Sequence, residues 1–190
     1  MEELTARFGA PILSSAFDQI IENLAKVVRS EMRKLFPEGE YQFCETVDTD
    51  GHGSGPVKLR YKLQVKGDSF VLDTTATDNQ SKGPINYIMS PRAPQMVMAA
   101  YINRNEPSFM SNAGCYASID EVKLRPGSVL QPNFPAALGF RGILLMRNVS
   151  ACLGLLNVAT GGKANASHSA YVIYYIRGKA DDGREQLRAL

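Results

Sequence analysis

Histidine and cysteine are scarce in this sequence, which holds two histidines and three cysteines among 190 residues. Neither His52 nor His168 lies in an HxH, HxxxH or HExxH pattern, so no metal site can be recognised from the sequence. Cys44, Cys115 and Cys152 show no CxxC spacing, which excludes a zinc ribbon and argues against a secreted disulfide framework. We therefore expect reduced, mostly buried thiols in a cytoplasmic protein.

Strong net charge and long apolar runs are also absent. The formal charge is +2 from 21 basic and 19 acidic residues, and the two signs are interspersed. This balance gives no electrostatic reason to expect nucleic acid or an anionic membrane as a partner. The longest apolar runs, GILLM and YVIYYI, are far shorter than the roughly 20 residues that span a bilayer. The opening MEELTARFGAP is polar and acidic, unlike a signal peptide. We expect a soluble protein without a membrane or nucleic-acid partner.

An amphipathic pattern occupies the first part of the chain. From Pro11 to Phe36 apolar residues recur every three or four positions, which predicts one long helix with a wide buried stripe. Pro11 suits the first turn of this helix, and Pro37 with Gly39 would end it. Its polar face carries no cluster of catalytic type, so we interpret the helix as a packing element.

The period then changes from helical to strand-like. Residues 41–47 and 57–66 alternate, and a tight turn leads from the second run into residues 69–75. The alternation in the second run separates four apolar positions from four polar ones: Leu59, Tyr61, Leu63 and Val65 against Lys58, Arg60, Lys62 and Gln64. This predicts an antiparallel strand with one buried face and one wet, basic face.

The rest of the chain predicts shorter elements. Two further helices are expected at 93–102 and 142–156, and residues 117–130 are typical of a strand, a Pro-Gly turn and a short return. Residues 169–178 are rich in aromatic and β-branched side chains, which favours a buried strand.

These elements predict one α+β domain spanning residues 1–190, with a long amphipathic helix packed on a mainly antiparallel sheet and two further helices. Within it we distinguish the long helix and its end, 1–39, an α/β core, 40–178, and a polar tail, 179–190, that we expect to be either frayed or a newly exposed end.

Several isolated features permit two interpretations each. His52, in DGHGSG, indicates a flexible solvated turn, and His168 is either a hydrogen-bonded structural histidine or a ligand or base. Cys115 is either a reactive thiol or a buried small hydrophobe. Residues 160–167, TGGKANAS, either present backbone N–H groups and Lys163 to an anion or form a helix C-terminus followed by a connection.

The stretch VLDTTATDNQSKGPIN, residues 71–86, is the most polar of these features. Asp78, Lys82 and Asn86 follow the end of a strand, where a scaffold commonly holds binding groups. Asp, Asn, Thr and Ser also satisfy their own backbone in turns, and Lys82 can simply be solvated. The residues alone leave both a binding loop and a connection open.

Four motifs in a fixed order resemble the hydantoinase B/oxoprolinase family: GEY, VLDTTATDNQSKGPIN, NAGCYASIDEVKLRPGSVLQPNFPAAL and ATGGKANAS. Within that family, GPINYIMSPRAPQM, LGFRGILLMRNVSACLGLLN and GGKANASHSAYVIYYIRG are similar to the α subunits of acetone carboxylase-type ketone carboxylases.

The resemblance implies that the chain is an internal segment of a larger hydantoinase B-type subunit. The implied function is a segment of the large subunit of an ATP-dependent ketone carboxylase, inactive by itself. One alternative is a segment of an ATP-dependent lactam or hydantoin ring-opening hydrolase of the hydantoinase/5-oxoprolinase type. Another is a non-catalytic scaffold or interface module.

The resemblance also implies partners and a set of site residues. The partners are the remainder of its own subunit and a hydantoinase A-type ATP-using subunit, with a small third subunit as a further candidate. ATP, Mg and either Mn or another divalent metal are implied for the whole complex, and this segment is expected to bind none of them. Asn86 and Asn112 lie in family-like motifs and are predicted to bind substrate, with Asp78 and Lys82 as additional candidates. No catalytic residue and no metal ligand is assigned.

Overall fold

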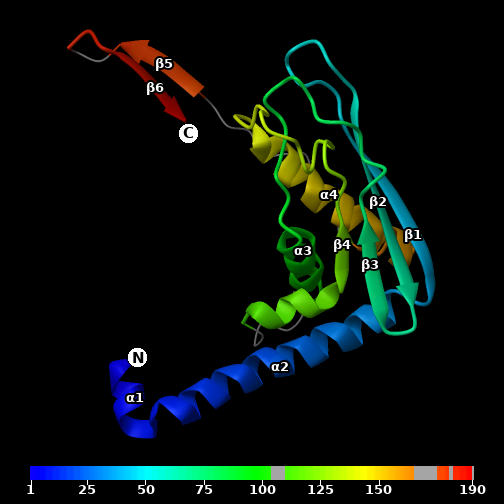
Figure 1. The fold of residues 1–190 in the computed structure, drawn as a ribbon, viewed down its shortest axis with the longest axis vertical. Coiled ribbons are helices and arrows are strands. Elements are labelled where there is room, and N and C mark those ends of the chain that lie inside the picture. Colours follow the sequence, from blue (N-terminus) through cyan, green and yellow to red (C-terminus); the bar gives the residue numbers. More distant parts are fainter. Residues whose placement is uncertain (104–109, 165–174, 180–181, 190) are drawn as a thin grey trace.

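The computed structural model describes residues 1–103, 110–164, 175–179 and 182–189. Within these ranges a four-stranded sheet has the strand order β1-β2-β3-β4 (Figure 1). Its strands are β1 (Gly39–Val47), β2 (Val57–Lys66), β3 (Ser69–Asp73) and β4 (Glu121–Lys123). The first three are antiparallel neighbours, and β4 pairs with β3 in parallel. The predicted α+β class, with a mainly antiparallel sheet, is confirmed.

Strand β2 separates the two faces of the sheet as the alternation predicted. Leu59, Tyr61 and Leu63 are buried, whereas Lys58 is exposed and Arg60 is half-buried on the opposite face. Full burial of a large apolar side chain stabilises the fold by about 1.5–3 kcal/mol relative to its exposed state. A one-residue slip of β2 would expose its whole buried row, so this pattern fixes the register of the sheet.

Helix α4 (Arg141–Thr160) packs on the apolar face of β1 and β2. Gly154 permits the close approach, since a Cβ there would lie 2.4 Å from the ring of Phe43. Buried Asn148 accepts a hydrogen bond from the hydroxyl of Tyr61 at 2.8 Å. Of the helices in the described ranges, α4 alone is long and apolar enough to cross a membrane by length and composition. Its packing on the sheet is that of a core helix.

The first helical region consists of two helices, α1 (Glu2–Phe8) and α2 (Ala10–Leu35), with Gly9 at φ 80° between them. Leu24, Val28 and Met32 of α2 are buried. Earlier in α2 the apolar side chains are exposed, among them Phe17 at 47% and Ile20 at 54%. The predicted wide buried stripe is therefore correct only for the C-terminal half of α2, because no other element covers the N-terminal half in the described parts of the chain.

The C-terminal half of α2 is held by η1 (Ala113–Ser118), a 3-10 helix that also contacts α3 (Arg92–Asn103). Arg29 of α2 forms two hydrogen bonds with the carboxylate of Asp120, which also accepts the backbone N–H of Phe70 at 2.7 Å. These bonds join α2 to the end of the sheet where β3 begins. The helices predicted at 93–102 and 142–156 correspond to α3 and α4, whereas η1 was not predicted.

The C-terminal region departs from the predicted pattern. Strands β5 (Tyr175–Lys179) and β6 (Glu185–Ala189) form a two-stranded antiparallel sheet that stands apart from the rest of the chain (Figure 1). We predicted a polar tail from residue 179 onward, either frayed or a newly exposed end. The structure excludes fraying of residues 185–189, because β6 pairs with β5 through five residues on each strand. Most of the strand predicted at 169–178 lies outside the described residues.

Candidate functional site

The polar segment after β3 folds back onto strand β2 through Asp78. The carboxylate of Asp78 accepts the backbone N–H of Lys58 at 2.8 Å and Nη1 of Arg60 at 2.5 Å. Partial burial by itself would raise the pKa of Asp78, but the hydrogen bonds from Arg60 and Lys58 outweigh it and hold that pKa below its ordinary value. Asp78 therefore fastens the loop to the edge of the polar sheet face.

Asn86 closes the next turn of the same segment. Its side chain is fully buried, and its Nδ2 donates towards the carbonyl oxygens of Ser81 at 2.9 Å, Gly83 at 3.1 Å and Ala137 at 3.0 Å. Its Oδ1 accepts the backbone N–H of Ser81 at 2.8 Å. Both hydrogens of the amide are thus engaged within the chain, and Asn86 holds the turn 81–86 against the loop that contains Ala137.

Asp50 lies at the centre of this arrangement and was not predicted as a site residue. Asp50 is 3% exposed, and its carboxylate accepts hydrogen bonds from the hydroxyl of Ser81 at 2.5 Å and from the backbone N–H groups of His52 at 2.8 Å, Ser54 at 2.9 Å and Gly83 at 3.2 Å. The bond from Ser81, followed by the backbone bonds, holds the pKa of Asp50 well below its usual range. We refer to Asp50, Ser81, Gly83 and Asn86 as the polar hub.

The polar hub corrects our interpretation of DGHGSG as a flexible solvated turn. The turn is built around Asp50, while the side chain of His52 is exposed. Gly83 permits this packing, since a Cβ there would lie 2.6 Å from the backbone oxygen of Asp50. The sequence did hold a signal, because an aspartate ahead of glycines and serine commonly accepts backbone N–H groups two residues later.

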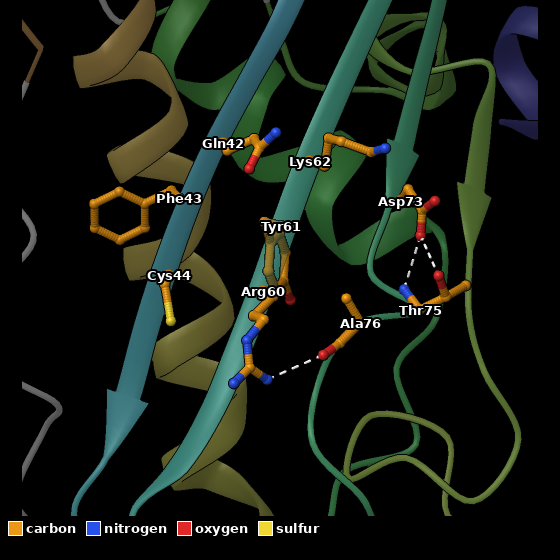
Figure 2. Close-up of a pocket in the computed structure, with 9 residues that line it drawn as sticks. All are labelled: Gln42, Phe43, Cys44, Arg60, Tyr61, Lys62, Asp73, Thr75 and Ala76. Atoms are coloured by element: carbon orange, nitrogen blue, oxygen red, sulfur yellow. Dashed lines mark hydrogen bonds between the residues drawn. The ribbon is translucent and has the colours of Figure 1, made fainter.

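An open groove of about 560 Å³ lies on the polar face of the sheet beside this loop (Figure 2). The lining residues are Gln42, Phe43, Cys44, Arg60, Tyr61, Lys62, Asp73, Thr75 and Ala76. Arg60 is held in place by Asp78 and by a 3.0 Å bond to the carbonyl of Ala76, and Asp73 accepts the N–H and hydroxyl of Thr75 at 2.8 and 2.6 Å. The side chain of Lys62 extends from β2 in the direction of Asp73 (Figure 2).

This groove holds two cations and one carboxylate: Arg60, paired with Asp78, Lys62, whose Nζ lies 3.8 Å from the carboxylate of Glu40, and Asp73. Arg60 and Lys62 can bind an anionic group, and Asp73 can accept a hydrogen bond from a hydroxyl or amine of the same ligand. The groove is thus chemically suited to a small polar molecule. Sequence analysis identified the wet, basic strand face but not the groove, because Asp73 meets Lys62 only through the register of β2 and β3, and Thr75 and Ala76 reach the groove only after the chain turns at the end of β3.

The four predicted substrate-binding residues do not form one cluster. Asp78 and Asn86 lie near the start of β2, and Lys82 between them is exposed on the same loop. Asn112 caps η1 by accepting the N–H of Gly114 at 2.7 Å. Since η1 leads into β4 beside the start of β3, Asn112 lies at the opposite end of the sheet from the polar hub (Figure 1).

The remaining candidates are resolved by burial and local geometry. Cys115 is fully buried in η1, as expected for a small hydrophobe, and burial raises the pKa of the Cys152 thiol to about 12. Gly161 has left-handed geometry and ends α4, which supports the helix-terminus interpretation of TGGKANAS. His168 lies outside the described residues. Within the described ranges no group of three His, Cys, Asp or Glu side chains could hold a metal ion.

Solved structures share this fold, among them the following two. An ATP-dependent caprolactamase from Pseudomonas jessenii superposes with a TM-score of 0.74 and 16% identity, over 97% of this chain and 32% of that chain. A nucleotide-free acetone carboxylase superposes with a TM-score of 0.79 and 17% identity, over 99% of this chain and 27% of that chain. At such identities the likeness concerns the fold alone, and the chain spans about a third or less of the length of either protein.

Sequence comparisons give the family. A search of curated proteins finds no match. A family model described as hydantoinase B/oxoprolinase matches residues 1–188, which is nearly the whole chain and includes the polar hub, the groove and η1. The chain therefore belongs to the hydantoinase B/oxoprolinase family.

Proposed function

We propose that this chain is a segment of the large subunit of an ATP-dependent ketone carboxylase and is inactive by itself. The observation that carries the proposal is the set of motifs similar to acetone carboxylase α subunits, within a family match over residues 1–188. The fold shared with acetone carboxylase, and the small share of that chain covered, support a segment of a larger polypeptide. Its cytoplasmic location is part of the same proposal.

In this proposal a hydantoinase A-type partner subunit would use ATP, with Mg, to activate the ketone by phosphorylation, and the enol or enolate-like carbon would then attack carbon dioxide or carboxyphosphate with release of phosphate. The remainder of the subunit would hold any further divalent metal such as Mn. Lactam or hydantoin ring opening is the second candidate, and the shared fold with an ATP-dependent caprolactamase favours it. There water takes the place of carbon dioxide as the second reactant.

The two reactions differ in what they consume. The native polypeptide, purified with its bound partners, is assayed for ATP hydrolysis with acetone and bicarbonate and separately with caprolactam. Consumption of ATP that requires both acetone and bicarbonate supports the carboxylase. Lactam-dependent ATP hydrolysis that is indifferent to bicarbonate contradicts it and supports the hydrolase.

Within the whole enzyme we propose that this segment mainly positions a loop. Three of the four predicted substrate-binding side chains bond to this chain's own groups: Asp78 to Lys58 and Arg60, Asn86 to three carbonyls, and Asn112 to Gly114. The bonds of Asp78 and Asn86 support a role in holding the loop that carries Lys82, whereas Asn112 caps η1 at the opposite end of the sheet. Exposed Lys82 is then the side chain of the four that is best placed to contact a ligand.

Substitution in the native complex tests this division of roles. Lys82→Ala should raise KM about tenfold or more, because it removes a charged contact with the substrate. The melting temperature should change little, because the side chain of Lys82 is exposed. Lys58→Ala, also an exposed lysine, is the matched control and should leave KM unchanged. An unchanged KM in Lys82→Ala would remove Lys82 from the substrate site.

A further inference from the structure

The first part of the chain exposes an unusual amount of apolar surface. We call α1 and the first half of α2, residues 2–23, the arm. No side chain of α1 is buried, and the first buried residue of α2 is Leu24. Six large apolar side chains of the arm are between 36% and 61% exposed: Leu4, Phe8, Ile12, Phe17, Ile20 and Ile21. The arm projects from the body of the molecule (Figure 1).

The exposed stripe continues one that is part of the core. Phe17 and Ile20 lie at helical spacing before Leu24, Val28 and Met32, so all five share one face of α2. Beyond Leu24 this face packs against η1 and the core. Before Leu24 the side chains of Phe17 and Ile20 on this face are exposed.

The helices of the arm would be only marginally stable if their apolar face stayed in water. Isolated helices shorter than about 12–15 residues are marginal in water, and most helical stability in proteins comes from packing of the apolar face. Contiguous exposed apolar patches of this kind mark interaction surfaces. The pattern of the arm is therefore that of a helix whose apolar face is covered in the functional protein.

We propose that the arm is an internal interface, covered by an apolar surface from another part of the same large subunit. The superpositions cover 97% and 99% of this chain, so they include the arm, but only 32% and 27% of the two longer chains. In both proteins an equivalent arm therefore belongs to a polypeptide about three to four times as long. This inference rests on the proposed function, in which the chain is a segment of such a subunit.

Hydrogen exchange measured on two samples tests which surface covers the arm. In the isolated 190-residue chain, amides of residues 10–23 should exchange rapidly, and in the native polypeptide freed of partner subunits they should exchange about 100-fold more slowly. Equal rates in the two samples overturn the proposal. Protection that appears only when a partner subunit is added also overturns it, as does protection in the isolated chain together with a discrete dimer in analytical ultracentrifugation.

Substitutions provide a second measurement. Ile20→Lys should lower the melting temperature of the native polypeptide by about 5 °C and leave that of the isolated chain unchanged. Phe134→Lys is the matched control, because Phe134 is 98% exposed and lies outside the arm. If Ile20→Lys has no effect on the native polypeptide, the arm is not an interface.

The two proposals fail in different ways. A native polypeptide of 20.8 kDa, or one without ATP-dependent activity, contradicts the proposed function. A much heavier, active polypeptide whose arm exchanges rapidly contradicts the arm interface alone.

Discussion

Asn86 shows how a residue that looks like a binding group can serve the loop that holds it. Its Nδ2 takes the place of backbone donors to three carbonyl oxygens, those of Ser81, Gly83 and Ala137, which lie 2.9–3.1 Å away. A buried carbonyl left without a donor costs about 1–3 kcal/mol. The side chain of Asn86 therefore contributes more to the free energy of unfolding than one ordinary hydrogen bond does.

Asn86→Ala should lower the free energy of unfolding by about 3 kcal/mol, since it leaves several buried polar groups unsatisfied. Urea denaturation of the 190-residue chain measures the change. Asn79→Ala, on the same loop but exposed, is the control and should change stability by less than about 0.5 kcal/mol. Equal effects of the two substitutions would mean that the bonds of Asn86 contribute nothing net.

The hydrogen bonds of Asp50 should make the stability of the chain depend on pH. The pKa of Asp50 is depressed in the folded state, so the folded protein binds its proton less readily than the unfolded chain. Its stabilisation is then fully present above the ordinary carboxyl pKa of about 4 and is lost as the pH falls towards the folded value. The stability difference between the wild type and Asp50→Asn should be largest above about pH 5 and shrink steadily below it.

Denaturation midpoints of the two proteins at pH 7, 5 and 3 would measure this difference. Asp48→Asn is the control, because Asp48 lies two positions away in the same connection and is exposed. A difference between wild type and Asp50→Asn that stays constant from pH 7 to pH 3 would show that the charge of Asp50 does not support the polar hub.

At the scale of elements, two glycines set how closely the layers approach. A Cβ on Gly154 would lie 2.4 Å from the ring of Phe43, and a Cβ on Gly114 would lie 2.5 Å from the backbone oxygen of Ile21. The first neighbour is a side chain and the second is helical backbone. The two contacts should therefore respond differently to a compensating substitution.

Gly154→Ala should destabilise the chain by about 2 kcal/mol, although alanine is the better helix former by up to about 1 kcal/mol. In a Phe43→Ala background the ring and its Cγ are gone, and Gly154→Ala should be neutral or stabilising. Urea denaturation of the four proteins gives the double-mutant cycle. Gly114→Ala is the contrast, since Leu24→Ala should not rescue a clash with backbone. Additive effects of Gly154→Ala and Phe43→Ala would contradict the assigned contact.

At the scale of the whole molecule, the elements predicted correctly from the sequence are those that a periodic pattern of apolar residues determines. Strand β2 and helices α3 and α4 were predicted because each repeats one pattern over ten or more residues. The 3-10 helix η1 and strand β4 were missed or only outlined, because they are short and owe their geometry to neighbours such as α2 and β3. Long elements with one buried face can thus be predicted from the sequence alone.

The candidate site was less predictable than the fold. The loop from 71 to 86 was identified, but Asp50, its main anchor, comes from a connection far away in the sequence. The roles of Asp78 and Asn86 also depend on partners such as Lys58 and Ala137 that no local pattern names. Contacts between loops are decided by the fold, so composition indicated a polar loop without showing which side chains face outward.

The molecule has one packed body and two extensions, the arm and the β5–β6 hairpin (Figure 1). In the hairpin Gly178, Lys179 and Arg184 are exposed, and among the described strands β5 pairs only with β6. A segment that buries little surface adds little to the stability of the body. Deletion of residues 175–190 should therefore move the melting temperature of the chain by less than about 2 °C.

Thermal unfolding followed by circular dichroism at 222 nm measures this, because the signal comes mainly from α2, α3 and α4 in the body. The matched control is Leu155→Ala, which truncates a buried side chain of α4 and should lower the melting temperature by about 5 °C or more. If the deletion is as damaging as Leu155→Ala, the hairpin is part of the cooperative unit. An unchanged transition would instead confine the cooperative unit to the sheet and the helices packed on it.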